Sequence, residues 1–351
     1  MDVWALNLPQ FYETKENNEW WGKGFTEWTN VKKAKPIFSG HEQPMEPLND
    51  FYYDLSKIET IKWQAELAKK YSVSGFVYYH YWYSGRHLLE KPCELLRDSP
   101  EIDIKYCFCW ANHPWTRAWN GKNQDVMVQQ IYGMEDEWEE HLQYLLSFFK
   151  DNRYLKISNK PVLFIYNTHD LENADKRIEY WNRRLQQEGF AGIYIVEYIS
   201  TFNPQPSIKS SQAVYEDEPN FTCRFEISNF NKAKRVLCKT LKLTDYQDYD
   251  SLYKLILKKR ATYDGRKIVL GCFPSWDNSA RKGKNSRIIT GANPKKFKLY
   301  LEKLKNIKRT DSMDMLLINA WNEWGEGTTL EPTKRYGYGY LEAMKDVFAN
   351  K

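Results

Sequence analysis

The sequence lacks any apolar stretch long enough to cross a membrane as a helix. Such a span needs roughly 18 apolar residues in a row, and no run within the 351 residues approaches that length. No secretory signal precedes Val3, so we expect a cytoplasmic location and no integral membrane segment.

Metal and nucleotide motifs are scarce as well. The six cysteines have no zinc-type spacing, and Cys107 and Cys109 stand in an apolar run that suits core thiols. A glycine-rich G-x-G-x-x-G turn is absent after the first apolar segment, which runs instead into Pro9-Gln10-Phe11. No Ser or Cys nucleophile elbow occurs. We therefore expect neither a metal nor another cofactor.

No block of a single charge dominates the chain. Lys and Arg number 51 against 46 Asp and Glu, a net charge of +5 with the two signs interspersed. This pattern does not suit a nucleic-acid partner. The lysine-rich stretches at 232–242, 282–284 and 295–308 are expected to be solvated faces, with weak attraction to an anionic lipid surface as the alternative.

Aromatic residues, by contrast, are abundant. Phe, Trp and Tyr make up 16% of the chain, with 14 tryptophans. Indole rings cover the apolar faces of sugar rings, and their NH groups supply hydrogen bonds. We expect Trp4, Trp63, Trp138 and Trp181 to pack within strands or helices. The other ten lie at predicted strand ends or in the loops that follow and would line a shared pocket: Trp20, Trp21, Trp28, Trp82, Trp110, Trp115, Trp119, Trp276, Trp321 and Trp324.

Eight apolar segments read as strands and mostly alternate with amphipathic helices. That alternation predicts a parallel sheet, and eight strands favour an α/β fold with a single (β/α)8 TIM barrel over residues 1–351. An open doubly wound sheet is the rival. The strands are predicted at 3–8, 75–83, 104–110, 161–167, 192–197, 213–216, 267–273 and 315–320.

Two segments exceed ordinary connections. Residues 10–53 form a long loop after the first strand, and its Trp and Gly content indicates a functional loop. Residues 219–248 read as an irregular insertion. Polar side chains gather where the strands end, which is where barrels place active sites. They are Gln10, His80, Asn112, Tyr166, Glu197, Glu216, Asp277 and Glu323.

The last predicted strand runs into Trp321-Asn322-Glu323-Trp324-Gly325-Glu326-Gly327. Two carboxylates three residues apart suit acetal chemistry, in which one group protonates the leaving oxygen and the other acts as base or nucleophile. The glycines allow a sharp turn that aims both groups into one cavity. Structural alternatives are a helix cap or a pair with Lys334 or Arg335. Glu331, just before a proline, is expected to be structural.

Other polar candidates keep two readings. His80 would orient a sugar hydroxyl or be a satisfied core histidine. The segment 276–281, with Asp277 and Asn278, would clamp a sugar or bury an Asp–Arg pair.

The combined motifs resemble the WbsX-like family of bacterial polysaccharide-biosynthesis proteins. The resemblance runs from residue 3 to about 343 and rests on the stretches 8–11, 20–31, 78–82, 109–112, 274–278 and 319–327. This domain is similar to glycoside hydrolase family 99, whose Asn-Glu-Trp-x-Glu-Gly-Thr motif matches residues 322–328. Asn7 departs from the family pattern, since relatives have an aromatic residue there.

The resemblance implies a retaining attack on α-mannosidic or related bonds. Glu323 would take the proton from the sugar 2-hydroxyl, which attacks C1 and gives a 1,2-anhydro sugar, and Glu326 would protonate the leaving oxygen. His80 and Tyr81 match the sugar-contacting stretch, and Tyr166 matches it less closely. The full set of expected sugar contacts is Gln10, Trp20, Trp21, Glu27, Trp28, His80, Tyr81, Trp82, Trp110, Asn112, Trp115, Tyr166, Trp276, Asp277, Asn278, Trp321 and Asn322.

The expected function is therefore a glycoside hydrolase or transglycosidase acting on an oligo- or polysaccharide, linked to O-antigen or capsule metabolism. Two rivals stay open. One is a glycosyltransferase that uses an activated sugar donor, and the other is a carbohydrate-binding barrel without catalysis. Peripheral association with membrane-bound polysaccharide machinery and the oligomeric state also stay open.

Overall fold

Eight parallel strands pair edge to edge into a closed ring in the computed structural model, which describes residues 1–351 apart from 118–121, 201–202, 259–261, 308 and 350–351. The order around the ring is β1, β15, β12, β10, β9, β8, β4, β2 and back to β1. The ring confirms the predicted barrel and excludes the open sheet. The strands are β1 (Asp2–Asn7), β2 (Gly75–Tyr83), β4 (Lys105–Trp110), β8 (Lys160–Ile165), β9 (Tyr194–Ile199), β10 (Ala213–Glu216), β12 (Lys267–Cys272) and β15 (Ser312–Ile318).

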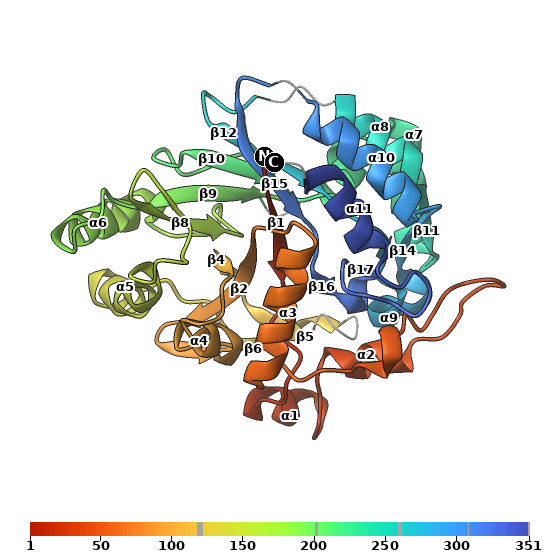
Figure 1. Ribbon diagram of the computed structural model, residues 1–351, viewed down its shortest axis with the longest axis horizontal. Coiled ribbons are helices and arrows are strands. Elements are labelled where there is room, and N and C mark those ends of the chain that lie inside the picture. Colours follow the sequence, from red (N-terminus) through yellow and green to blue (C-terminus); the bar gives the residue numbers. More distant parts are fainter. Residues whose placement is uncertain (118–121, 201–202, 259–261, 308, 350–351) are drawn as a thin grey trace.

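Helices surround the ring (Figure 1) because each carries one apolar stripe. In α5, for example, Trp138, Leu142 and Leu145 are buried on one side of the helix. No helix separates β9 from β10 in the part of the chain that the structure describes. The outer helices are α3 (Ile58–Lys70), α4 (Lys91–Arg97), α5 (Glu135–Phe149), α6 (Ala174–Gln187), α8 (Tyr249–Lys258), α10 (Pro294–Lys305) and α11 (Gly339–Phe348).

The ring closes where β1 meets both β15 and β2. Trp4 pairs with Leu317 on one side and with Gly75 on the other. Beyond the strand ends, the Asn322 side chain accepts a hydrogen bond from the Leu8 amide at 2.7 Å and donates one to the Leu8 carbonyl at 2.9 Å. The Asn322 side chain thus joins the segment after the first barrel strand to the segment after the last, at the residue that precedes Glu323.

The long connection after β1 contains three short helices, and Thr14 and Thr26 cap the first two. The structure therefore adds regular elements within the predicted 10–53 loop. They are α1 (Lys15–Trp21), α2 (Glu27–Lys33) and η1 (Leu48–Asp50).

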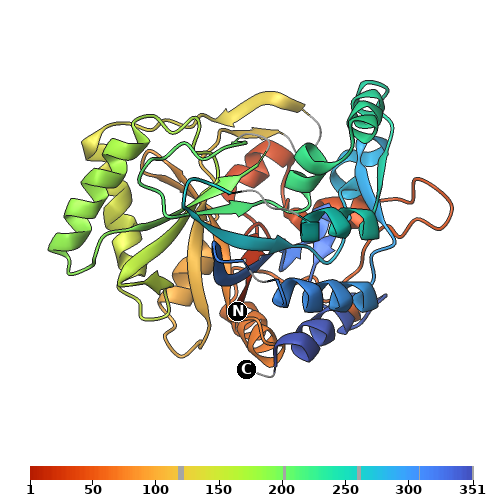
Figure 2. The ribbon, with the colours of Figure 1, turned by 90° about the horizontal axis from the view of Figure 1, so that it is seen from above.

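Further short elements surround the carboxyl end of the barrel. The region predicted as irregular, 219–248, holds three of them: η3 (Thr222–Glu226), α7 (Asn229–Thr240) and β11 (Asp245–Asp248). Figure 2 shows the β5–β6 hairpin and α7 standing out on the side where the barrel strands end. The remaining elements are β3 (Arg86–Leu88), β5 (Trp115–Arg117), β6 (Lys122–Val128), β7 (Lys156–Ile157), β13 (Trp276–Asp277), α9 (Ser279–Lys282), η4 (Gly283–Asn285), β14 (Arg287–Thr290), β16 (Asn322–Glu323), η5 (Trp324–Glu326) and β17 (Thr328–Thr329).

Candidate active site

A cavity of about 220 Å³ opens at the carboxyl ends of the barrel strands. Its walls come from residues at or just beyond the ends of seven strands, because inward-pointing side chains of a barrel converge there. Tyrosines, one tryptophan and three carboxyl groups dominate the lining. The residues are Leu8, Tyr79, Tyr81, Ala111, His113, Trp115, Thr116, Tyr166, Tyr198, Asp217, Asn220, Asn319, Glu323 and Glu326.

Two of these carboxylates meet at one guanidinium. Nη2 of Arg281 lies 2.8 Å from Oε2 of Glu323, and Nη1 lies 2.8 Å from Oε1 of Glu326. The third nitrogen, Nε, binds Glu27, again at 2.8 Å. Arg281 comes from α9, Glu27 from α2, and the other two from the turn after β15. A single arginine therefore fixes three carboxylates from three parts of the chain.

The approach of Glu27 and Arg281 depends on Gly325. A Cβ on this glycine would overlap the Glu27 carboxylate and would come within 2.7 Å of the Arg281 Nε. Gly327 has a left-handed φ of 62°, and a Cβ there would lie 2.6 Å from the Asp277 carbonyl oxygen. Glycine is thus required at both positions for reasons of space or backbone conformation. Gly325 thus makes room for the ion-pair cluster, and Gly327 makes room for the Asp277 backbone.

The cluster has more negative than positive groups. Burial raises the pKa of Glu323 to about 8, Glu326 and Glu27 add to the rise, and Arg281 opposes it. Burial likewise raises the pKa of Glu27, against the pull of Arg281. Although burial works against it, the three glutamates hold the pKa of Arg281 above its ordinary value. Because one cation faces three acids, the site favours keeping a proton among the carboxylates.

The two candidate catalytic groups differ in exposure. The Glu323 side chain is 9% exposed and the Glu326 side chain 25%. Glu326 can therefore meet solvent or a leaving group, while Glu323 lies deeper. Aromatic rings of Tyr79 and Tyr81 line the same cavity. One carboxyl group is thus shielded and its neighbour is more exposed. Two carboxyl groups in different environments suit different proton-transfer roles.

Asp217 is a third acid of the cavity that the sequence motifs do not indicate. It follows β10 and accepts hydrogen bonds from Asn319 at 3.1 Å and Asn220 at 3.0 Å. Burial raises the pKa of Asp217 to about 7, while hydrogen bonds from Asn220 and Tyr198 oppose the rise. A carboxyl group poised near neutrality can accept or donate a proton at a sugar hydroxyl.

Of the predicted residues, five line the cavity: Glu323, Glu326, Tyr81, Trp115 and Tyr166. Tyr81 and Trp115 also contact each other, with ring centroids 4.7 Å apart. Glu27 touches the cluster through Arg281 but is itself fully buried.

Three expected sugar contacts lie instead between the barrel and α5. His80 pairs Nε2 to Nε2 with His141 at 2.9 Å, and burial lowers its pKa to about 3. Trp82 stacks on His141 and donates a hydrogen bond to Glu137 at 2.6 Å. Trp110 packs on the same histidine. Successive strand residues point to opposite faces, so Tyr81 faces the cavity while its neighbours His80 and Trp82 face the helices.

Other predicted contacts are buried away from the cavity. Asn322 holds Leu8, and Asn112 accepts a hydrogen bond from the Asn167 amide at 2.8 Å. Gln10 is fully buried and does not line the cavity. Trp321 is fully buried against Phe76.

The remaining predicted residues lie around the site without lining the cavity. Trp28 donates a hydrogen bond to the Tyr53 carbonyl and packs on Trp324. Trp20 lies near Trp115, with ring centroids 6.2 Å apart. Asp277 is bound by His41 at 2.7 Å and Gln43 at 3.0 Å. Three others pack locally: Trp21 stacks on Phe25, Trp276 is buried in β13, and Asn278 accepts a hydrogen bond from the Arg287 amide. Trp119 lies outside the described residues.

Glu331 is structural, as the sequence suggests. Its carboxylate accepts hydrogen bonds from Tyr53 at 2.8 Å, Gln64 at 2.8 Å and Trp324 at 2.7 Å. Burial raises the pKa of Glu331 to about 7, and these donors oppose the rise. The third carboxylate of the closing segment therefore supports the structure around Trp324, next to Glu323.

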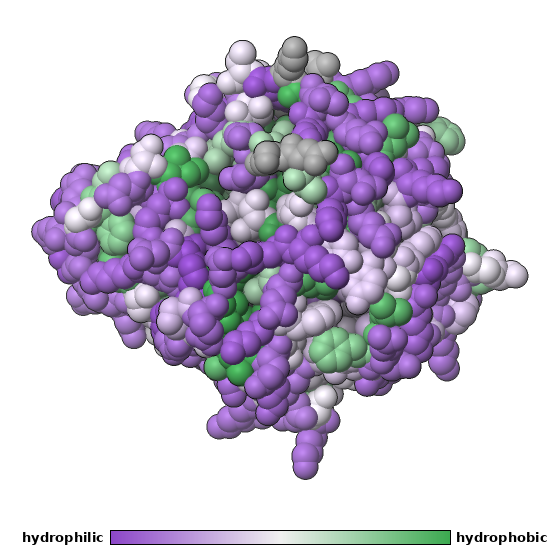
Figure 3. All heavy atoms as spheres, viewed as in Figure 1, coloured by the Kyte–Doolittle hydropathy of each residue, from purple (hydrophilic) through white to green (hydrophobic). Residues whose placement is uncertain are grey.

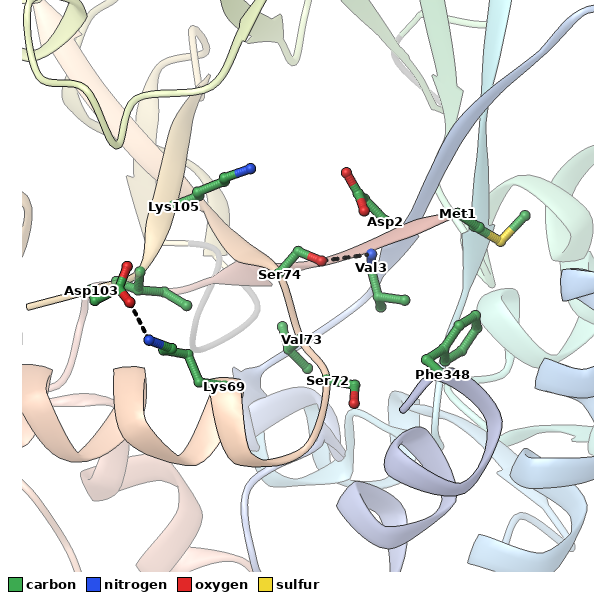
Figure 4. Close-up of a pocket in the computed structure, with 11 residues that line it drawn as sticks. Met1, Asp2, Val3, Lys69, Ser72, Val73, Ser74, Asp103, Lys105 and Phe348 are labelled. Carbon is green, nitrogen blue, oxygen red and sulfur yellow. Dashed lines mark hydrogen bonds and ion pairs between the residues drawn. The ribbon is translucent and has the colours of Figure 1, made fainter. Parts of the chain in front are cut away.

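A second cavity, of about 340 Å³, lies at the opposite end of the barrel, where β1 begins (Figure 4). There Asp103 is paired with Lys69, and Ser74 accepts a hydrogen bond from the Val3 amide. Barrels place catalysis at the carboxyl ends of their strands. The carboxyl-end cavity is therefore the candidate active site.

Among the described residues no group of three or more His, Cys, Asp or Glu side chains is placed to hold a metal ion. The tripeptide Asp248-Tyr249-Asp250 has the Asp-x-Asp form found in some sugar transferases. Its acids are engaged elsewhere: Asp248 caps the Ser251 amide, and Asp250 binds Lys296 and Tyr300. Neither acid lines the cavity. No described helix is long and apolar enough to span a membrane.

A known protein family matches almost the whole chain. The family model described as "Glycosyltransferase WbsX" matches residues 3–344. Two curated relatives, each described as "Uncharacterized protein WxcX", come from two strains of Xanthomonas campestris pv. campestris. Each is 32% identical over 347 residues, which cover 98% of this chain and 49% of the relative. The chain thus spans about half the length of the curated relatives it matches.

Solved structures show the same fold. One, described as a "Glycoside hydrolase-like protein", has a TM-score of 0.60 at 14% identity, with 99% of this chain and 93% of that chain covered. The endo-alpha-mannosidase of family GH99 from Bacteroides thetaiotaomicron has a TM-score of 0.52 at 13% identity, with 98% and 95% covered. At these identities the likeness concerns the barrel alone.

Proposed function

The chain belongs to the family described as Glycosyltransferase WbsX, and on that premise we propose that it is a glycan-active enzyme that cleaves or transfers a glycosidic bond with retention of configuration. One observation carries the proposal. Glu323 and Glu326 open into an aromatic cavity while sharing the guanidinium of Arg281.

In the proposed reaction Glu323 removes the proton from the 2-hydroxyl of the sugar. The freed oxygen attacks C1, the bond from C1 to the leaving oxygen breaks, and Glu326 gives its proton to that oxygen. The product of this half is a 1,2-anhydro sugar. Glu326, now ionised, then takes a proton from water or an acceptor hydroxyl. The new oxygen attacks C1 and opens the small ring, and Glu323 returns its proton to O2.

The two environments support this division of labour. A sugar hydroxyl is a weak acid, so a carboxylate whose pKa is raised is a better base toward it. Glu323, with its pKa near 8, suits that role, and Arg281 stabilises its ionised form. Glu326 is the more exposed group and can reach both the leaving oxygen and the incoming water. These assignments rest on the motif match and on this difference in exposure.

The proposed substrate is an oligo- or polysaccharide of bacterial surface-glycan metabolism with α-mannosidic or related linkages. Tyr79, Tyr81, Tyr166 and Tyr198 would cover the sugar ring, since flat aromatic faces suit its C–H surface. Asp217 and Asn319, bonded to each other, would bind its hydroxyls. We infer the α-mannosidic linkage from the endo-alpha-mannosidase that shares this fold.

A second candidate function is sugar transfer from an activated donor, which the family description itself favours. In that case the same glutamates would act on a donor whose leaving group is a phosphate ester. A third candidate, sugar binding without catalysis, gives no role to the pairing of Glu323 and Glu326 at one guanidinium.

One experiment separates the three. Defined mannose-containing oligosaccharides are incubated with the protein, with and without nucleotide sugars, and the products are identified by mass spectrometry. Shortening without a donor supports the hydrolase, and growth only with a donor supports the transferase. If sugars bind but never change, both enzymatic proposals fail. An inverted anomer in the NMR spectrum of the first product would refute the anhydro-sugar route.

A further inference from the structure

Helix α7 exposes its apolar face to solvent. Phe230 is 78% exposed, Leu237 57% and Leu241 56%. With about 3.6 residues per turn, these three positions share one face of the helix. Val236 and Leu243 are also exposed, at 61% and 52%. We call Phe230, Leu237 and Leu241 the α7 patch.

The opposite side of α7 faces the protein and is basic. Arg235 donates a hydrogen bond to the Cys223 carbonyl at 2.6 Å, and Lys232 donates one to the Phe225 carbonyl at 2.9 Å. No residue of α7 is buried. A surface helix ordinarily turns its apolar stripe inward. The reversed orientation leaves the α7 patch without an intramolecular partner among the described residues.

Figure 3 shows the hydropathy of one face of the molecule. In the view of Figure 3 hydrophilic residues predominate, and hydrophobic ones appear in separate small groups. Single exposed apolar residues are common, whereas a contiguous set on one helix indicates a contact surface.

Charge around the patch identifies the kind of surface that it fits. Residues 229–244 contain no acidic residue, and three of their five basic side chains are exposed, those of Lys234, Lys239 and Lys242. The loop at Lys282 and Lys284 lies beside it, because the Thr244 hydroxyl donates to the Lys284 carbonyl at 2.9 Å. Lysines next to an apolar stripe suit anionic headgroups above an acyl layer.

We propose that α7 docks the protein on an anionic lipid bilayer by inserting the α7 patch at the headgroup boundary. The helix stands out on the side of the cavity (Figure 2), and the insertion that carries it begins beside Asn220, which lines that cavity. Docking would therefore bring the cavity to the membrane surface. The proposal is independent of which reaction the glutamates perform.

The test is sedimentation with vesicles of phosphatidylcholine and phosphatidylglycerol, using the whole chain. The unaltered protein should bind these vesicles and should bind pure phosphatidylcholine vesicles less, with the difference shrinking at high salt. The variant L237S/L241S should bind at least about tenfold more weakly, because two inserted leucines are lost. Its circular dichroism and melting temperature should be unchanged, since both side chains are exposed.

Two controls make the result decisive. I131S removes an equally exposed side chain (59%) on the distant β6–α5 connection and should leave vesicle binding intact. K239E/K242E should weaken binding to the anionic vesicles while leaving the patch in place. The proposal is overturned if the unaltered protein ignores the vesicles or if L237S/L241S binds as well as the parent. It is also overturned if the parent elutes as a dimer that L237S/L241S converts to a monomer, which would make α7 an interface between copies.

Discussion

Arg281 and Glu323 form an ion pair at the wall of the cavity, with 2.8 Å between Nη2 and Oε2. The pair joins α9, beyond β12, to the turn beyond β15. Its guanidinium also holds Glu326 and Glu27. The charge of Arg281 thus affects how readily Glu323 gives up its proton, and several measurable consequences depend on it.

Replacing either catalytic glutamate should abolish turnover while preserving sugar binding. E323Q and E326Q are each expected to lower kcat by about 10²-fold or more, since each removes a proton-transfer group. Isothermal titration with substrate and rate measurement on the same samples test this. E331Q, which alters the structure around Trp324 but neither glutamate of the pair, should keep most of the parent rate. Normal turnover by E323Q or E326Q would remove that residue from the mechanism.

The rate should depend on pH through Glu323. The proposed base must be ionised, and its pKa is about 8, so kcat/KM should rise as the pH rises toward 8. In R281Q the opposing positive charge is gone, and the rising limb should move to higher pH by about one unit or more. K284Q serves as the matched control, because it also removes a positive charge from this region but at an exposed lysine. A rising limb that stays in place in R281Q would disprove the coupling.

Gly325 should tolerate no side chain. In G325A the new methyl group would overlap the Glu27 carboxylate and crowd Arg281, displacing the cluster. Because misplacement by about 1 Å can cost about 10²-fold, we expect a loss of that order in kcat/KM. The melting temperature, measured in parallel, should fall by only a few degrees. A fully active G325A would show that the cluster geometry is not needed for the reaction.

Glu331 should make folding stability depend on pH. Its folded pKa, about 7, exceeds its ordinary value of 4.5, so the folded state binds more protons between these values. Stability from this group is therefore greatest below pH 4.5 and declines as the pH rises to about 7, by on the order of 3 kcal/mol. Urea unfolding across this range checks it. E331Q should flatten the decline, and an unchanged slope would contradict the assignment.

The barrel and the glutamate pair were predictable from local patterns. Apolar segments bounded by polar residues located all eight strands, and the segment 321–327 identified both acids. The orientation of the residues in β2 was not predictable. Barrel strands are buried on both faces, so hydrophobicity alone does not show whether Tyr81 or His80 faces the cavity. The structure places Tyr81 on the cavity side and His80 on the helix side.

The ion pairs between residues far apart in the sequence were also not predictable. The partners of Arg281 lie 254 positions away, at Glu27, and 42 away, at Glu323, and no local motif joins them. Asp217 also belongs to the cavity through tertiary placement alone. The apolar residues of α7 face solvent, whereas the apolar stripe of a surface helix ordinarily faces the core. Amphipathic spacing alone therefore does not predict which side of α7 packs against the protein.

The Asn322–Leu8 clasp has a consequence for how the protein acquires activity. It joins residues 314 positions apart, and Glu27 must likewise wait for Arg281. During synthesis β1 can pair early with β2, but its β15 partner, the Asn322 clasp and the Arg281 partner of Glu27 are made only near the end of this chain, and such distant contacts form slowly. The carboxylate cluster therefore cannot assemble before the ring closes, and a nascent or partly unfolded chain lacks it.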